Sequence, residues 1–252
     1  SAEQLEKMIQ LLGPLQHVLT GYVLPKFSAQ DGHACLQQIA TQNTLGFTLY
    51  AMPILESRAI LKTESRLDEL LAIRTLLEEF EPIVLNVRIG STDFCGMLGL
   101  RRSIRQTVYD LASIRECLAD IMNVFLRDNS PFVLSGSVWE YFGNDAALAG
   151  LVREIELDSL NGLIGKTIIH PSHIEAVQAM YVVTHEEFSD AERIVLQSYG
   201  EIGVEKSNYG NKMNEMKPHF LWAERILLRA QVFGVLKPEY SAEHLLQRPV
   251  VV

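Results

Sequence analysis

Two carboxylates stand where apolar stretches of the sequence end, and their positions suit metal-assisted chemistry. Glu56 closes the stretch TLYAMPILE, and Asp93 follows the stretch VLNVRIG. Both stretches have the composition of buried strands. A hard divalent cation such as Mg²⁺ binds one or two protein carboxylates and completes its octahedron with water and substrate oxygens. The structural alternative is that Glu56 caps the next helix and Asp93 fixes the turn GST.

Basic side chains near these carboxylates are candidates for substrate binding. Arg88 lies five residues before Asp93 and can either hold a carboxylate through two parallel hydrogen bonds or form a structural ion pair with a helix. Lys26, at the end of VLPKF, either adds positive charge to the same site or lies on the surface. Arg101 and Arg102 follow Asp93, and taken alone they suit a solvated surface pair better than an anion clamp.

The segment GLIGKTIIHPSHIEAV holds two further candidates, Lys166 and His170. Its GKT is not a phosphate-binding loop, because Leu160 stands where the first glycine of GxxxxGK[ST] belongs and the GKT opens a predicted strand. His170 and His173 could ligate a metal, but the proline between them favours the start of a helix. No Gly-x-Ser-x-Gly, CxxC, HExxH or GxGxxG motif occurs, which disfavours serine hydrolases, zinc proteases and Rossmann dehydrogenases.

The elements that position these residues alternate between strand and helix patterns. Five apolar segments rich in β-branched or aromatic residues are predicted as strands: VLTGYVLPKF, LGFTLYAMPILE, PIVLNVRIG, PFVLSGSVWEYF and GKTIIHP. Each precedes a longer segment with helical periodicity, such as ESRLDELLAIRTLLEEF. This alternation predicts an α/β fold with a parallel sheet, whose ligand site forms where the strands end.

Strands of this type cease after His170. We therefore expect an α/β domain over residues 1–181 and a C-terminal helical extension over residues 182–252, with GVEKSNYGNK as a polar loop. Trp222, in that extension, is expected in apolar surroundings, either in a lid over the strand ends or at a subunit boundary.

The composition of the 252 residues narrows the class of protein. The formal charge of −9 disfavours nucleic acid as a partner, because binding a phosphate backbone needs a basic face. No apolar run approaches the roughly 20 residues of a membrane helix, and the N-terminus lacks the pattern of a secretory signal, so we predict a cytoplasmic location. The three cysteines form no CxxC pair and are predicted to be buried, reduced thiols.

Four of these segments, in their order, resemble the citrate lyase β-subunit family of carbon–carbon lyases, part of the HpcH-type aldolase superfamily of pyruvate-binding TIM barrels. VLPKF resembles the family's strand ending in Pro-Lys, and MPILES its strand ending in a metal-binding glutamate. RIGSTDFCGMLGL resembles its Gly-x-x-Asp-Leu segment, and GKTIIHPSHIEAV its Gly-Lys-x-x-Ile-His-Pro-x-Gln-Ile segment. Phe94 replaces the leucine of that pattern, and His173 replaces the glutamine. The tail NKMNEMKPHFLWAERIL is similar to a divergent bacterial branch of the family.

The resemblance implies a fold, a cofactor and a reaction. The implied fold is a TIM (β/α)₈ barrel, and the implied ligands of a Mg²⁺ or Mn²⁺ ion are Glu56 and Asp93. The implied activity is that of a carbon–carbon lyase or aldolase acting on a 2-oxo acid or an acyl-CoA-like substrate through a metal-stabilised enolate. No residue is assigned as general acid or base. The candidate substrate-binding residues are Arg88, Lys26, Lys166 and His170.

Three wider expectations accompany this interpretation. The five predicted strands match the last five of the resembled barrel, so we expect three further strand-helix units upstream of Ser1. A homo-oligomer is expected, as is common in the resembled superfamily. The competing functional hypothesis is a metal-binding, catalytically silent barrel that serves as a metabolite-binding scaffold or regulatory partner.

Overall fold

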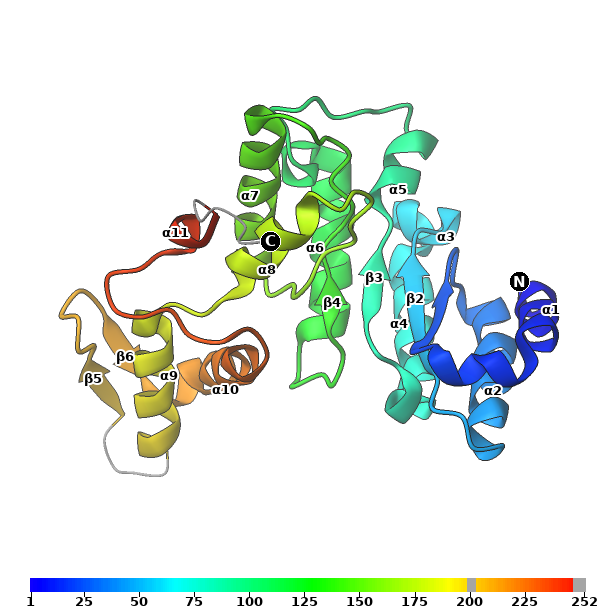
Figure 1. Ribbon diagram of the computed structural model, residues 1–252, viewed down its shortest axis with the longest axis horizontal. Helices are drawn as coiled ribbons and strands as arrows, with labels where there is room; N and C mark the ends of the chain where they lie inside the picture. The colour runs from blue at the N-terminus through cyan, green and yellow to red at the C-terminus, as the bar shows by residue number, and fades with distance from the viewer. Residues whose placement is uncertain (199–202, 247–252) are drawn as a thin grey trace. The chain divides into compact units, whose positions relative to one another are not determined.

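The computed structural model describes residues 1–198 and 203–246 and separates into two compact units, Ser1–Ile169 and His170–Val252. The units are coloured blue to green and yellow to red in Figure 1. The division falls before the boundary expected after residue 181. The reason is that the helix containing His173 packs against later helices, so it belongs to the second unit.

The first unit repeats strand and helix. Its elements are α1 (Ala2–Leu12), the 3₁₀ turn η1 (Gly13–Val18), β1 (Gly21–Leu24), α2 (Ala29–Thr44), β2 (Tyr50–Leu55), α3 (Arg58–Leu61), α4 (Thr63–Glu79), η2 (Glu81–Ile83), β3 (Val87–Ile89), α5 (Ser91–Met97), η3 (Val108–Asp110), α6 (Ala112–Leu126), β4 (Leu134–Ser135) and α7 (Asp145–Leu160). The first four predicted strands contain β1 to β4. Ser28 and Asn144 cap α2 and α7 by accepting backbone N–H groups, as N-cap residues do.

The sheet is parallel, in the order β1-β2-β3-β4. Ile54 pairs with Arg88 and Leu55 with Ile89, which places the ends of β2 and β3 side by side. The fifth predicted strand, GKTIIHP, is reduced to a single parallel bridge between Lys166 and Gly136. Parallel strands joined through helices fit the predicted α/β class.

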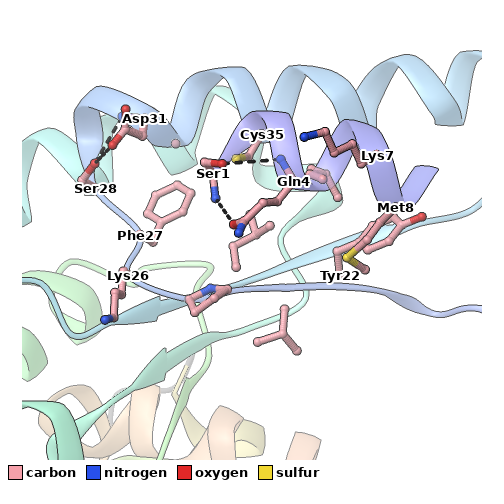
Figure 2. Close-up of a pocket in the computed structure, with 15 residues that line it drawn as sticks. Ser1, Gln4, Lys7, Met8, Tyr22, Lys26, Phe27, Ser28, Asp31 and Cys35 are labelled. Atoms are coloured by element: carbon pink, nitrogen blue, oxygen red, sulfur yellow. Dashed lines mark hydrogen bonds between the residues drawn. The ribbon is translucent and has the colours of Figure 1, made fainter. Parts of the chain in front are cut away.

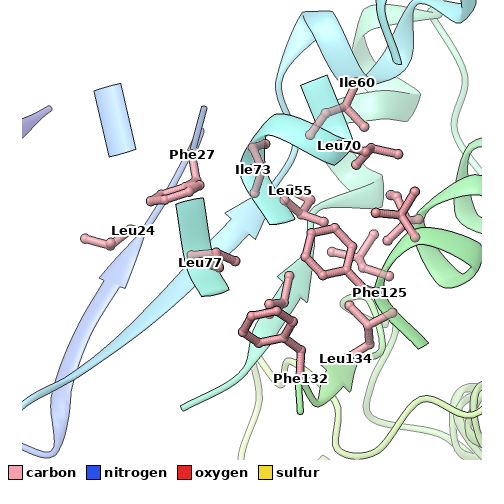
Figure 3. Packing of buried hydrophobic residues seen from close by; sticks show 14 of the residues in the cluster. Leu24, Phe27, Leu55, Ile60, Leu70, Ile73, Leu77, Phe125, Phe132 and Leu134 are labelled. Carbon is pink, nitrogen blue, oxygen red and sulfur yellow. The ribbon is translucent and has the colours of Figure 1, made fainter. Parts of the chain in front are cut away.

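Helices α2, α4 and α6 pack along one face of this sheet and close the main core. Burial alternates along β2, where Ala51, Pro53 and Leu55 are buried and Tyr50, Met52 and Ile54 are only partly buried. Figure 3 shows Leu55, Leu77 and Phe125 from strand and helices meeting in this core. The helix-facing side of the sheet is therefore the better-buried one, and the opposite side carries partly exposed residues.

The part of the second unit that the structure describes contains helices and one hairpin. Its elements are α8 (His173–Tyr181), α9 (His185–Gln197), β5 (Val204–Lys206), β6 (Met213–Glu215), α10 (Met216–Phe233) and α11 (Ala242–Leu246). Its core lies mainly between α9 and α10.

The segment GVEKSNYGNK, expected as a loop, instead contains β5 and the turn of an antiparallel hairpin. The buried carboxylate of Asp190 explains this order: it accepts hydrogen bonds from Ser207 Oγ at 2.8 Å and Asn214 Nδ2 at 2.9 Å. Lys212 Nζ also lies 2.9 Å from Asp190. A polar sequence is thus organised by one buried charge in place of an apolar face.

Trp222 is 38% exposed in the single chain, so it is not buried within its own unit, and its expected place in a lid or at a subunit boundary stays a prediction. The buried positions of α10 include Ala223, Ile226 and Ala230, which are spaced by three and four residues along one helical face. Trp222 lies one residue off that face.

Cys35, Cys95 and Cys117 are buried free thiols, which confirms the prediction from their spacing. Across residues 1–198 and 203–246, no helix has the length and apolar character needed to cross a membrane.

Candidate metal and substrate site

Glu56 and Asp93 come together at the carboxyl ends of β2 and β3. Glu56 directly follows β2 and is 8% exposed, whereas Asp93 lies in the first turn of α5 with its side chain 44% exposed. The two side chains are close enough to share a hydrogen bond. One buried and one accessible carboxylate therefore face a common point at the edge where the parallel strands end.

The local electrostatics disfavour two negative charges here. Burial raises the pKa of the Glu56 carboxyl, and the neighbouring Asp93 carboxylate raises it further. The backbone N–H of Lys26 opposes this rise by donating to Glu56 Oε1 at 2.8 Å. A bound cation would offset the repulsion between the carboxylates, so the pair is suited to a positively charged ligand.

Lys26 contributes through both its backbone and its side chain. It adopts a left-handed conformation with φ of 52°, which is uncommon for a residue other than glycine, and in it the N–H reaches Glu56. The adjacent Phe27 N–H donates to Ile54 O at 3.2 Å and ties this turn to β2. The exposed ammonium of Lys26 lies 4.0 Å from Asp93 Oδ1. Lys26 thus contacts both carboxylates.

A cavity of about 650 Å³ adjoins Lys26 and lies between α1, β1 and the start of α2. Figure 2 shows Tyr22 and Met8 on its apolar side, with Lys26 and Phe27 at one end. Lys26 therefore connects the carboxylate pair to an apolar recess.

Arg88 lies beside Glu56 but is already hydrogen-bonded. Its Nε and Nη2 donate to Thr167 Oγ1 at 3.3 and 2.8 Å. Burial lowers the pKa of Arg88, and the nearby Glu56 charge raises it. The Arg88 guanidinium thus brings positive charge toward Glu56 while Thr167 fixes its orientation.

Lys166 is committed to other partners. Its side chain is fully buried, with Nζ 2.9 Å from Glu154 Oε1 and 2.7 Å from Asp158 Oδ2 on α7. No side-chain atom of Lys166 is exposed, so its ammonium is not placed to contact a substrate, contrary to the expectation from the sequence.

His170 belongs to the second unit, where it precedes α8. Its Nδ1 lies 2.8 Å from Ser172 Oγ, in agreement with a helix start at HPSH. The suggestion that His170 binds substrate stays a prediction.

Arg102 differs from the solvated surface residue that its sequence neighbourhood suggested. Its guanidinium is buried, with Nη1 2.6 Å from Glu154 Oε2 and its carbon 5.1 Å from the centre of the Trp139 ring. Glu154 is 52 residues further along the chain, and no local pattern in the sequence connects the two.

The donor set fits a hard divalent cation with an open coordination sphere. Among the described residues, no group of three or more histidine, cysteine, aspartate or glutamate side chains is arranged to enclose a metal. Glu56 and Asp93 would therefore supply two oxygens, and water or substrate would supply the rest. This is how Mg²⁺ is commonly held, whereas structural Zn²⁺ takes four nitrogen or sulfur ligands.

Comparison with solved structures supports the barrel architecture. A citrate lyase from Burkholderia xenovorans matches with a TM-score of 0.69 and 17% identity, over 98% of this chain and 74% of that one. CitE from Mycobacterium tuberculosis, in complex with magnesium, acetoacetate and coenzyme A, matches with a TM-score of 0.56 and 21% identity, over 92% of this chain and 74% of that one. RipC from Yersinia pestis matches with a TM-score of 0.50 and 21% identity, over 72% of this chain and 73% of that one.

Comparison by sequence identifies the family directly. No curated protein matches the sequence at a significant level. A family model described as a C-C bond lyase of the TIM-barrel fold matches residues 1–235, which is nearly the whole chain. The resemblance drawn from the strand-end motifs is confirmed, and the chain belongs to the family of carbon–carbon bond lyases of the TIM-barrel fold.

Proposed function

We propose that the protein is a divalent-cation-dependent carbon–carbon lyase or aldolase acting on a 2-oxo acid or an acyl-CoA-like substrate. The observation that carries this proposal is the pairing of Glu56 and Asp93 at the carboxyl ends of adjacent parallel strands. The complex of CitE with magnesium, acetoacetate and coenzyme A supports the choice of cation and substrate class. Family membership supports the reaction class.

In this proposal the acidic side chains bind the cation and the basic side chains attract the substrate. Glu56 and Asp93 would hold Mg²⁺ or Mn²⁺, which when bound supplies positive charge to substrate oxygens as the carbon–carbon bond breaks or forms. The Lys26 N–H orients the Glu56 carboxylate so that Oε2 is left for the ligand. The Lys26 ammonium and the Arg88 guanidinium add positive charge on either side, which favours an anionic substrate.

Metal binding is the first test. We expect wild-type protein to bind Mn²⁺ in calorimetry, and we expect Glu56→Gln and Asp93→Asn each to weaken binding at least about tenfold, equal to about 1.4 kcal/mol. The exposed substitution Glu116→Gln is the matched control. Circular dichroism spectra should be unchanged in all four proteins. Unchanged Mn²⁺ affinity in both site variants would show that the carboxylates do not form the site.

Turnover is the second test. Candidate 2-oxo acids and acyl-CoA thioesters are incubated with the protein and Mg²⁺. Cleavage of the carbon–carbon bond is measured by the amount of product released. Turnover that disappears in Glu56→Gln supports the lyase. Metal-dependent binding of these compounds with no cleavage of any of them would instead favour the scaffold hypothesis.

A further inference from the structure

Four buried charged side chains form a compact group beside the sheet, which we call the α7 charge cluster: Arg102, Glu154, Asp158 and Lys166. Glu154 accepts from Lys166 through Oε1 at 2.9 Å and from Arg102 through Oε2 at 2.6 Å. Asp158 accepts from Lys166 at 2.7 Å. Within the cluster two cations face two anions, and each of these side chains is at least nine-tenths buried. The less buried Glu140 adds a third carboxylate, 3.6 Å from Arg102 Nε.

Most polar atoms of the cluster are hydrogen-bonded; Arg102 Nε is the exception, and it lies 3.6 Å from Glu140 Oε2. Tyr109 donates its hydroxyl to Asp158 Oδ1 at 2.8 Å, and the Val108 N–H donates to Glu154 Oε2 at 2.9 Å. Arg102 also donates to the carbonyl of Val138. Buried ion pairs are seldom more stabilising than apolar residues of the same volume, because desolvation offsets their attraction. Four charged side chains buried together therefore call for an explanation beyond stability.

The cluster lies directly behind a residue of the candidate site. Lys166 and Thr167 are consecutive in an extended segment, so their side chains point to opposite faces of the sheet. Lys166 points toward α7, and Thr167 accepts from Arg88 on the other face. The backbone supports this arrangement, because Thr167 N–H donates to Gly136 O at 3.1 Å.

Gly136 shows how closely the cluster is fitted to this segment. A Cβ at position 136 would lie 2.1 Å from Asp158 Oδ2, so only glycine allows the carboxylate to approach the backbone here. Asp158 therefore packs directly against Gly136, the residue that follows β4. Through Lys166 it is also connected to the segment that carries Thr167. Displacement of the carboxylate would be transmitted to both.

We propose that the α7 charge cluster is a positioning device for the candidate site: by anchoring Lys166 it fixes Thr167, whose hydroxyl orients the Arg88 guanidinium beside Glu56. Arg88 pairs in register with Ile54, two residues before Glu56. The orientation of its guanidinium therefore determines how close its positive charge lies to the two carboxylates. The role of Arg88 toward a substrate rests on the proposed function. The chain of contacts from α7 to Arg88 does not.

The test follows the Arg88 Nε–H by nuclear magnetic resonance, assigned by its loss in Arg88→Lys. Thr167→Val removes the acceptor, and the charge-balanced double variant Lys166→Met with Asp158→Asn dismantles half of the cluster. We expect Nε–H exchange at least about tenfold faster in both than in wild type. Thr167→Ser keeps the hydroxyl and should retain slow exchange. Arg153→Met, which removes an exposed ion pair from α7, is the matched control.

Binding gives the second readout. Oxalate, whose adjacent carboxylate oxygens resemble those of a 2-oxo acid, is titrated in the presence of Mn²⁺. We expect oxalate affinity to fall about tenfold in Thr167→Val and in the double variant, equal to about 1.4 kcal/mol. Mn²⁺ affinity without oxalate should stay within about twofold of wild type, because Glu56 and Asp93 are untouched.

The outcomes separate the two proposals. A folded double variant with wild-type Nε–H exchange and wild-type oxalate affinity would overturn the positioning role and leave the cluster a purely stabilising one. If the double variant does not fold, the volume-conserving Glu154→Gln takes its place, with the same expected changes and the same contradicting result. Wild-type protein that binds neither Mn²⁺ nor oxalate would overturn the proposed function, while the exchange measurement would still decide the positioning role.

Discussion

Gly90 lies directly against the carboxylate of Glu56. A Cβ at position 90 would be 2.1 Å from Glu56 Oε2 and 2.5 Å from its Cβ, far inside any van der Waals contact. Gly90 is also the N-cap residue of α5, the short helix that carries Asp93. The glycine thus sets the distance between the end of β2 and the start of α5, and with it the separation of the two carboxylates.

Gly90→Ala should therefore damage the site through shape alone. The added methyl group would displace the Glu56 side chain, so we expect Mn²⁺ affinity to fall at least about tenfold and stability to fall by about 1–3 kcal/mol, as for other overpacked positions. Calorimetry and urea unfolding measure the two effects.

Gly96→Ala, in the same helix, is the matched control for that substitution. Its Cβ would meet nothing within 4 Å, and alanine favours a helix, so this variant should bind Mn²⁺ normally and gain up to about 1 kcal/mol. Equal Mn²⁺ affinities for the two alanine variants would argue against a packing role for Gly90.

Glu56→Gln should stabilise the metal-free protein at neutral pH. Because burial raises the pKa of Glu56, the fold favours its neutral form, and this contribution is present below the ordinary glutamate pKa but lost as pH rises through the raised value. Glutamine keeps an oxygen for the Lys26 N–H and does not titrate. We expect the variant to be the more stable protein at pH 7 and the two proteins to converge near about pH 4.

Urea unfolding with a chelator at several pH values measures this difference, and Glu116→Gln serves as the exposed control. A Glu56→Gln protein less stable than wild type at pH 7 would contradict the sign.

Lys26→Asn should separate the backbone role of Lys26 from its charge. Asparagine tolerates the left-handed conformation, so the N–H bond to Glu56 should persist. Loss of the ammonium near Asp93 removes a competitor for the cation. Because Lys26 is largely exposed, we expect only a small rise in Mn²⁺ affinity, of about two- to fivefold, that shrinks with added salt.

Lys26→Ile provides the contrast, because a β-branched residue is strained at positive φ. We expect that variant to lose about 1–3 kcal/mol of stability in urea unfolding. Equal stabilities for the asparagine and isoleucine variants would argue against backbone strain at this position.

Arg102→Met should be strongly destabilising. It leaves Glu154 with a single cationic partner and removes the contact with Trp139. Breaking a buried ion pair on one side costs about 3–5 kcal/mol. The neighbouring Arg101 is exposed, so Arg101→Met should change stability by less than about 0.5 kcal/mol in the same denaturation experiment. Similar losses for both variants would contradict the buried position of Arg102.

The strand ends could be predicted because local composition determines them. Apolar runs mark β1 to β4, and parallel strands bring their carboxyl ends to one edge, so the proximity of Glu56 and Asp93 follows from two segments read separately. The predicted family followed from the same segments.

Features that depend on distant partners could not be predicted in this way. Arg102 has the sequence neighbourhood of a surface residue, and only the fold brings Glu154 to it. The hairpin of the second unit has polar strands organised by the buried Asp190, which leaves no alternating apolar pattern. The positive φ of Lys26 could not be predicted from the sequence either, since lysine has no preference for that conformation.

The burial of all three native thiols opens a practical route to measurements in solution. Burial raises the pKa of Cys35 and Cys95, and that of Cys117 to about 12, so little reactive thiolate is present at neutral pH. A cysteine introduced at the exposed position of Trp222, and another at the exposed position of Leu45, should therefore be labelled selectively without removing native residues. Fluorophores or spin labels attached at this pair would report the separation of the two units directly, with and without Mn²⁺.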